Sequence, residues 1–206
     1  AGETHAIDVV IRSDDIVEDN ETFTITLGDV TGTSASQDAS ITTGAVSDGL
    51  ILNDDSAVLM ISNIAETETD SDFTVQATVT LSAEVEGGFD VAYSLGLGTA
   101  EATDVSVQGN SLSFAGTAGE TQVIDVVIVG DDIVEEDETF TITLGDVTGM
   151  SAVQDAAITS GVVSDGLINN DDTAVLTISD ITETETDSDF TVQATVTLNA
   201  EVEAGF

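Results

Sequence analysis

Polar and apolar residues alternate along several stretches of this chain. The alternation extends over the nine residues Phe73–Leu81 and the six residues Thr139–Leu144, with threonine at most of the polar positions. A period of two with one polar face is typical of half-buried antiparallel strands. The apolar run Ala57–Ile61 is short enough to be a more fully buried strand. We therefore predict that the chain is built mainly from β-strands.

Further apolar runs complete one module of a β-sandwich. No stretch shows sustained helical periodicity, and clusters of Gly, Asp and Asn supply turns between the runs. About seven strands at this spacing are typical of a β-sandwich. The four additional strands are predicted at Phe89–Leu95, Ser111–Phe114, Val123–Val129 and Ala156–Val163.

The sequence repeats itself with a period of 117 residues. Residues 1–89 align with residues 118–206 without a gap, and only 18 of the 89 positions differ. Asn53–Asp55 and Asn170–Asp172 each precede a new apolar run, so we place module boundaries after Asp55 and Asp172. The domains predicted are the back of one module (1–55), a complete module (56–172) and the front of the next (173–206). We expect a window cut from a longer array, either an arbitrary one or a subunit that polymerises end to end.

The net charge of the chain limits the classes of partner that it can bind. It has 1 Lys or Arg against 41 Asp and Glu, which gives a formal net charge of −40. Nucleic acid and anionic membrane surfaces are excluded as partners because both require a cationic protein surface. Hydrophobic residues make up 41%, enough for a core, yet no apolar run is long enough for a transmembrane segment. There is no Cys, which excludes disulfides and thiolate metal sites.

The densest acidic run, Asp131–Glu138, lies in a turn between two predicted strands. Carboxylates that converge without a basic partner repel one another, and a hard cation relieves this repulsion. Ca²⁺ suits such a cluster better than Mg²⁺ because it accepts six to eight oxygens in loose geometry. The earlier copy keeps the same kind of residues at Asp14, Asp15, Glu18, Glu21, Asp54 and Asp55.

Other interpretations of the acidic run are a solvated loop or a different metal. Zinc is disfavoured, because there is no Cys and His5 is the only histidine. An EF-hand is excluded, because Gly is absent from the turn position and strands flank the loop. Enzymatic activity is not expected, since the single His leaves no basis for a Ser-His-Asp triad in the complete module.

Several motifs together resemble those of the Calx-β family. They are GDDIVEEDETFTITL at residues 130–144, Leu112-Ser113-Phe114, Ala118–Thr121, Gly98-Thr99-Ala100 with Thr103-Asp104, and the closing Asn-Asp-Asp. The resemblance covers essentially the whole chain. It implies an all-β fold of tandem immunoglobulin-like antiparallel sandwiches, with Ca²⁺ bound at one end of a sandwich in members that bind it.

The resemblance also implies a ligand set, carried over position by position. Either Glu66 or Glu68 matches the Glu of the first strand, and Gly130 stands where the family often has a third Asp. The remaining ligands implied are Asp104, Asp131, Asp132, the Ile133 carbonyl, Glu135, Glu138, Asp171 and Asp172.

We expect a calcium-stabilised structural repeat of a secreted or cell-surface protein from a prokaryote. Its partners would be neighbouring modules, with a homopolymer or filament formed through end-to-end contacts as one form of the array. Near-identical copies favour a role in which every module has the same task, as in an adhesin stalk or a matrix element. The alternatives are a Ca²⁺ sensor that regulates a membrane or effector domain, and a module that binds a glycan, another surface ligand or ice.

Overall fold

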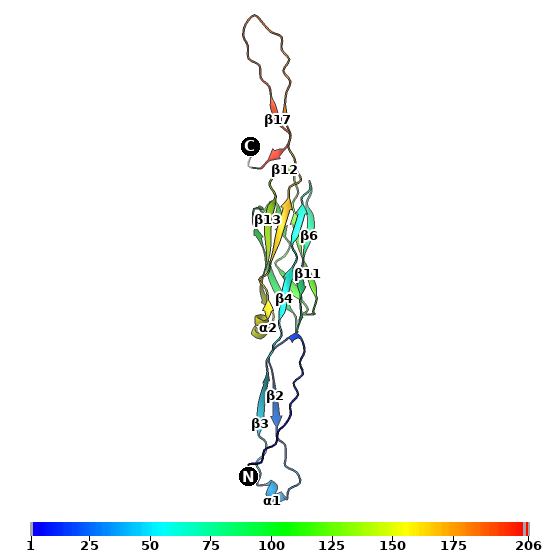
Figure 1. Ribbon diagram of the computed structural model, residues 1–206, viewed down its shortest axis with the longest axis vertical. Coiled ribbons are helices and arrows are strands. Elements are labelled where there is room, and N and C mark those ends of the chain that lie inside the picture. The colour runs from blue at the N-terminus through cyan, green and yellow to red at the C-terminus, as the bar shows by residue number, and fades with distance from the viewer. Residues whose placement is uncertain (1, 204, 206) are drawn as a thin grey trace.

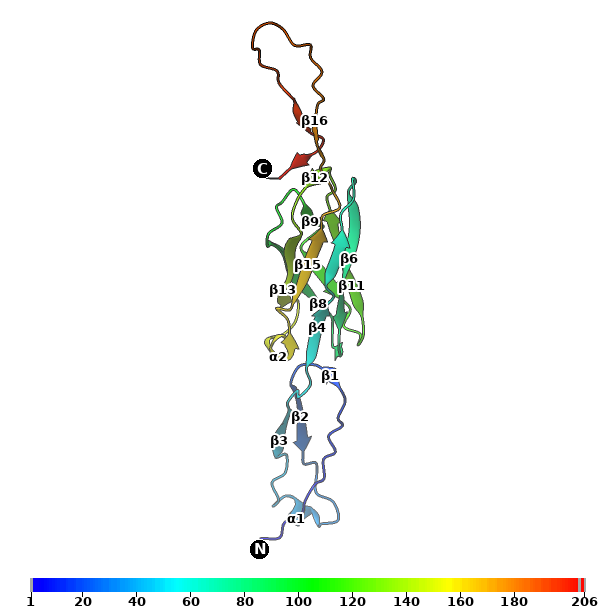
Figure 2. The same cartoon turned by 45° about the horizontal axis from the view of Figure 1, so that its top comes forward.

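A two-layer sandwich occupies residues 57–169 and lies between two slender, mostly unpaired segments of an elongated molecule (Figures 1 and 2). The computed structural model describes residues 2–203 and 205. Residues before the sandwich extend from one of its ends, and residues after it extend from the other (Figure 1). In the described part of the chain no helix has the length and apolar character needed to cross a bilayer.

Two five-stranded sheets form the sandwich. One has the strand order β10-β8-β13-β15-β5, and the other has the order β14-β4-β6-β11-β9. The first sheet comprises β10 (Ser111–Phe114), β8 (Phe89–Leu97), β13 (Glu138–Thr148), β15 (Val163–Asn169) and β5 (Ile64–Thr67). The second comprises β14 (Ile158–Thr159), β4 (Ala57–Ile61), β6 (Phe73–Leu81), β11 (Thr121–Ile128) and β9 (Val105–Val107).

Short elements lie at the two ends of the sandwich and beyond them. Two-residue strands pair across the ends, β1 with β7 and β12 with β18. These outer elements are β1 (Ile16–Val17), β2 (Glu21–Thr26), α1 (Ala35–Asp38), β3 (Val46–Ile51), β7 (Glu84–Val85), β12 (Ile133–Val134), α2 (Ala152–Ala157), β16 (Leu176–Ile178), β17 (Val196–Leu198) and β18 (Glu201–Val202).

The core is aliphatic and follows the alternation of the strands. Phe140, Ile142 and Leu144 of β13 are at most 1% exposed, while the threonines between them face outward. Phe89 and Phe114 stack at one end, with ring centroids 5.2 Å apart. The all-β sandwich predicted from this period is confirmed.

The first strand of the module changes sheets at Ser62 and Asn63. β4 pairs antiparallel with β6, whereas β5 pairs parallel with β15 in the other sheet. Side chains fix the crossing, because Ser164 Oγ donates to the Ser62 carbonyl at 2.7 Å and Asn63 Oδ1 accepts from the Asp165 amide at 3.0 Å. The change brings the end of β5 beside the end of β15.

One strand prediction is wrong in part. Ala156–Val163 was expected to be a single strand, but residues 156 and 157 end helix α2, and only β14 and the first residue of β15 are extended. Ser151 caps this helix by accepting from the Gln154 amide, and the Gln154 side chain accepts from the Ser151 amide in return. This capping box stabilises a helix too short to show periodicity.

We predict that Gly166→Ala destabilises the sandwich. Gly166 faces Phe140 across the β13–β15 pair, and a Cβ on it would lie 2.3 Å from Phe140 Cζ. Because Phe140 is only 1% exposed, its ring has nowhere to move. The expected loss is about 1–3 kcal/mol in the free energy of unfolding, measured by urea denaturation.

The matched control is Gly145→Ala on β13, the strand that carries Phe140. Its new Cβ would meet Ala92 Cβ at 3.7 Å, an ordinary contact. We expect this variant to stay within about 0.5 kcal/mol of the parent or to gain slightly. Equal losses in both variants would contradict the role assigned to the Phe140 ring.

Candidate metal centre

Carboxylates gather at the end of the sandwich that faces residues 173–206. Here β5 and β15 end side by side, and the turn between β11 and β13 lies beside the turn between β5 and β6. The Gly130 amide donates to Asp72 Oδ1 at 3.3 Å, which joins the two turns. The topology therefore brings together acids from four separate parts of the sequence.

The parallel β5–β15 pair determines which glutamate of the Glu66–Glu68 segment faces the cluster. The Glu68 amide donates to the Asn169 carbonyl at 3.0 Å, and Asn169 Nδ2 donates to the Glu66 carbonyl at 2.9 Å. Glu68 is 3% exposed and lies with Asp171 and Asp172, whereas Glu66 is outside the cluster.

Two groups of three carboxylates are each close enough to share an ion. Glu68, Asp171 and Asp172 each offer an oxygen within 4.8 Å of the others, and so do Asp70, Asp132 and Asp172. Asp172 belongs to both groups. The arrangement resembles two adjacent cation positions with one shared carboxylate.

The remaining predicted residues lie at the same end, in the loop before β9, in the acidic turn and at the start of β13. The Val129 amide donates to the Asp104 carbonyl at 2.8 Å, which holds the loop before β9 against the end of β11. Asp131 Oδ1 accepts from the Ile133 amide at 2.7 Å, so the acidic turn folds back on itself. Asp104, Asp131, Ile133 and Glu135 are all partly buried, and Glu138 is 7% exposed.

Asn170 connects the acidic turn to the end of the module. Its Oδ1 accepts from the Glu135 amide at 3.1 Å, and its Nδ2 donates to the Asp172 carbonyl at 3.0 Å. The sequence marked this residue only as part of a boundary motif. Its side chain in fact positions Glu135 and Asp172 relative to one another.

Burial and mutual repulsion raise the pKa values of the inner carboxyl groups. Burial, followed by repulsion from Asp131 and Asp171, raises the pKa of Glu68 to about 7. The pKa of Glu135 is also about 7, from burial and then from Asp131 and Asp104. The pKa of Glu138 reaches about 8, from burial and then from Asp104.

Two buried carboxylate oxygens have no hydrogen-bond partner among the described residues. They are Glu138 Oε2 and Asp172 Oδ2. A buried polar atom without a partner is costly, so one that is retained points to a missing ligand. The only Lys or Arg in the chain is Arg12, which belongs to the preceding copy. The donor set consists of oxygens alone and fits a hard cation such as Ca²⁺.

Asp70 is a residue of the cluster that sequence reasoning missed. It lies in the turn after β5 and approaches Asp132 and Asp172. Gly130 allows this turn to lie against the acidic run, since a Cβ on residue 130 would lie 1.7 Å from the Thr69 carbonyl oxygen. The Gly in the acidic run was therefore the available signal, because it marks a close approach of another backbone.

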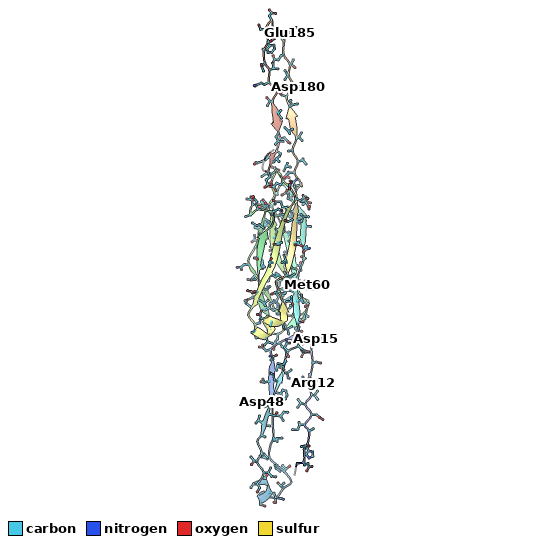
Figure 3. The ribbon with its side chains drawn as sticks, turned by 60° about the vertical axis from the view of Figure 1, so that its left-hand side comes forward. Arg12, Asp15, Asp48, Met60, Asp180 and Glu185 are labelled. Atoms are coloured by element: carbon cyan, nitrogen blue, oxygen red, sulfur yellow. The ribbon has the colours of Figure 1, made fainter. Side chains whose placement is uncertain are left out.

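The preceding copy has an equivalent but smaller cluster. Burial and then Asp14 raise the pKa of Glu18, and burial and then Asp54 raise the pKa of Asp55. Asp15 lies where this copy meets the sandwich (Figure 3). The acids that this copy contributes are Asp14, Asp15, Glu18, Glu21, Asp54 and Asp55; counterparts of Glu68, Asp70 and Asp104 are not in the chain.

The following copy carries its counterpart of Glu68 far from the junction. Glu185 corresponds to Glu68 in the repeat and lies on the distal part of the hairpin formed by residues 173–206 (Figure 3). This glutamate therefore lies away from the carboxylates that gather around Glu68.

Comparisons with solved structures return matches of low sequence identity, among them Calx domains and a periplasmic chaperone. The apo-form Calx CBD1 domain aligns with 57% of this chain and 100% of its own length, at 21% identity and a TM-score of 0.46. The calcium binding domain CBD12 of CALX1.1 aligns with 56% of this chain and 44% of its own, at 21% identity and a TM-score of 0.41. The periplasmic chaperone SfaE aligns with 56% of this chain and 58% of its own, at 11% identity and a TM-score of 0.40.

Comparison of the sequence with known proteins and families identifies the family of the chain. A search of curated proteins gives no significant match. The model of the Calx-beta domain matches residues 2–55 and 53–172. This match covers more than half of the sequence and agrees with the motifs around Asp131 and Glu138. The chain belongs to the Calx-beta domain family.

Proposed function

We propose that this chain is a calcium-stabilised structural repeat of a secreted or cell-surface protein. The observation that carries the proposal is the buried Glu138 Oε2, which has no partner within a carboxylate cluster that has no basic side chain. Glu68, Asp70, Asp132, Asp171 and Asp172 would hold Ca²⁺, with Asp104, Glu135 and Glu138 alongside. Bound Ca²⁺ supplies positive charge and accepts several oxygens at once.

The in-line arrangement of the copies supports a mechanical task. The copies follow one another along the long axis, so each module touches only its neighbours (Figure 1). Stability in such an array is a sum of module and interface contributions. Extracellular calcium at about millimolar concentration is sufficient for the weak sites found in extracellular modules. An adhesin stalk, a matrix element or a filament of a prokaryotic surface would use these properties.

The alternatives have less support from the residues. A sensor needs divergent modules with separate tasks, whereas these copies differ at only 18 of 89 aligned positions. A glycan site normally offers aromatic platforms, and the chain has no Trp and only 4% aromatic residues. A catalytic role is not supported either, because the complete module contains no His, Cys or Lys.

We predict that Ca²⁺ raises the thermal midpoint of the full chain. Ligand binding to the folded state alone adds about 2.7 kcal/mol at one hundred times Kd, which corresponds to about 10 °C for a module of this size. Differential scanning calorimetry in calcium, in magnesium and in chelator at fixed salt measures the shift. Only calcium should produce it.

Two variants make this experiment specific. Glu135→Ala should abolish the calcium-dependent shift, because it removes a carboxylate that lies close to Asp131 and Glu68. Asp146→Asn, on the exposed face near the other end of β13, should leave the shift unchanged. A parent protein with equal midpoints in calcium and chelator would refute the calcium proposal and leave the fold assignment intact.

We also predict that the calcium-free protein loses stability as pH rises. The folded-state pKa values of Glu68, Glu135 and Glu138 are about 7, 7 and 8, against an ordinary value of 4.5. The folded protein therefore binds these protons more tightly than the unfolded chain, and their contribution is fully present below pH 4.5. It is lost as pH rises through 7 to 8.

Urea denaturation in chelator at pH 5.5 and pH 8.5 tests this pH dependence. Glu138→Gln keeps the shape of the side chain but cannot ionise, so it should flatten the decline. Asp146→Asn serves again as the control. A parent protein that is more stable at pH 8.5 than at pH 5.5 would show that the inner carboxyl groups ionise without cost.

A further inference from the structure

Residues 1–55 and 173–206 repeat two parts of the complete module that pair with one another there. In the repeat, residues 1–55 correspond to residues 118–172, and residues 173–206 correspond to residues 56–89. Within the sandwich these two parts form three strand pairs, β11 with β6, β15 with β5, and β14 with β4. The molecule therefore carries, on opposite sides of the sandwich, both halves of an interface that the sandwich itself already contains (Figure 1).

Each of the two parts retains a strand pair of the complete module in the same register. β2 pairs with β3 so that Glu21 lies opposite Ile51, and Glu138 lies opposite Ile168 at positions 117 residues later. β16 pairs with β17 in the register in which β4 pairs with β6, 117 residues earlier. These pairs are preformed, and each has an open edge that accepts a further strand.

The strands that would join the two parts have no partner in the described part of the chain. Residues 4–11 correspond to β11, the strand that pairs with the whole of β6 in the sandwich. No strand is formed by residues 4–11. Residues 190–198 correspond to β6, and only their last three residues, in β17, are paired. The longest strand pair between the two parts is therefore absent from both ends of the molecule.

The unpaired segments expose apolar side chains that the complete module buries. Ile7 is 61% exposed, whereas its counterpart Ile124 is 0% exposed. On the other part, Val196 is 59% exposed, and its counterpart Val79 is 0% exposed. Removing such side chains from water favours association, and the surface of the partner part is complementary to them by descent from the same module.

The strands that neither part supplies lie at a single edge of the sandwich. Residues 90–117 have no counterpart in either part, and they include most of β8 together with β9 and β10. β10 and β8 end one sheet, and β9 ends the other. The two parts together still supply the equivalents of β13, β15 and β5 in one layer and of β14, β4, β6 and β11 in the other. This strand number is sufficient for a two-layer sandwich.

We propose that residues 173–206 of one chain and residues 1–55 of a second copy of this chain assemble into a sandwich by strand addition. Because the two parts lie on opposite sides of the complete module, each copy contacts one copy through each part (Figure 1). Such a head-to-tail contact repeats and produces an open polymer. The inference rests on the proposed structural role of the repeat, but the pairing does not involve the calcium site.

The register of the complete module determines which residues meet in this assembly. Ile124 lies opposite Ala77 in the β11–β6 pair, so Ile7 of one copy should lie opposite Ala194 of the other. Both parts are acidic, so their mutual repulsion opposes assembly. Association should therefore strengthen from about 0.1 M to about 1 M NaCl, as the Debye length falls from about 10 Å to about 3 Å.

Sedimentation velocity of the 206-residue chain, over a range of protein concentrations in chelator and high salt, tests the assembly. The parent should form dimers and larger species as its concentration rises. Ile7→Asp with Val9→Asp should weaken association about tenfold or more, because both side chains would be buried in the new sandwich. The matched control is Ala6→Asp with Val10→Asp, which adds the same charge at positions whose counterparts on β11 face outward. It should stay within about twofold of the parent.

Thermal unfolding at low protein concentration shows whether these variants leave the sandwich intact. Residues 4–11 lie outside the complete module, so both aspartate pairs should keep the midpoint of the parent. A weaker association of the Ile7/Val9 variant then reports the contact between copies and not a loss of fold.

An inter-chain disulfide reports the register, since the chain has no Cys. Asp125 and Gln76 lie opposite one another and share a hydrogen bond of 2.8 Å, and their counterparts are Asp8 and Gln193. A mixture of Asp8→Cys and Gln193→Cys chains should form a mixed dimer on oxidation, because directly opposite residues lie about 4.5–5.5 Å apart, within reach of a disulfide. Val10→Cys with Gln193→Cys, displaced by two residues to a separation of about 7–8 Å, should form much less. A tag on one chain separates mixed dimers from those of like chains.

The outcomes separate this assembly from the calcium proposal. A parent that stays monomeric at every concentration in high salt overturns the assembly, and a calcium-dependent thermal shift would still stand. Equal weakening by both aspartate pairs, or equal cross-linking of both cysteine mixtures, also overturns it, because the contact then lacks the register of the sandwich. Assembly that persists in a protein without a calcium-dependent shift supports the contact between copies and refutes the calcium site alone.

Discussion

The junction end of this sandwich concentrates negative charge that the chain itself cannot neutralise. Burial and then neighbouring aspartates raise the pKa values of three glutamates there, and two carboxylate oxygens are enclosed without a partner among the described residues. A protein with 41 Asp and Glu and only 1 Lys or Arg cannot neutralise this charge with its own side chains. Protons at low pH, or the cations proposed above at neutral pH, would neutralise this charge. The free energy of unfolding therefore depends on the pH and on the cations in solution.

The fold brings these acids together from distant parts of the sequence. The change of sheet at Ser62 and Asn63 places Glu68 beside Asp171 and Asp172, although these residues are about a hundred positions apart in the sequence. An unbroken first strand would stay in the sheet of β6 and carry Glu68 elsewhere. The hydrophobic core around Phe140 supplies the rigidity that keeps like charges in place.

Strand periodicity was sufficient to predict most of the sandwich. Ala57–Ile61, Phe73–Leu81 and Ser111–Phe114 match β4, β6 and β10, because their alternation or apolar run reflects burial directly. Helix α2 was not predicted, because its six residues are too few to show helical periodicity. A capping box, not an amphipathic pattern, stabilises it. The Glu66–Glu68 ambiguity could not be resolved from sequence either, because the parallel pairing with β15 decides it. Asp70 was missed because it reaches the site through a close backbone approach at Gly130.

The elements that sequence reasoning found hardest are those that connect modules. Helix α2 holds the Glu86 carbonyl through Gln154, and its capping residue Ser151 also donates to Asp19 of the preceding copy. Neither contact leaves a periodic signal, because each involves one side chain and one distant partner. The repeat itself supplies the missing information. Glu84–Glu86 and Glu201–Glu203 meet their preceding copies in the same register, although different parts of those copies are present. A junction that recurs in this way follows from local sequence, so every further copy with these residues would add the same geometry and the same unneutralised charge.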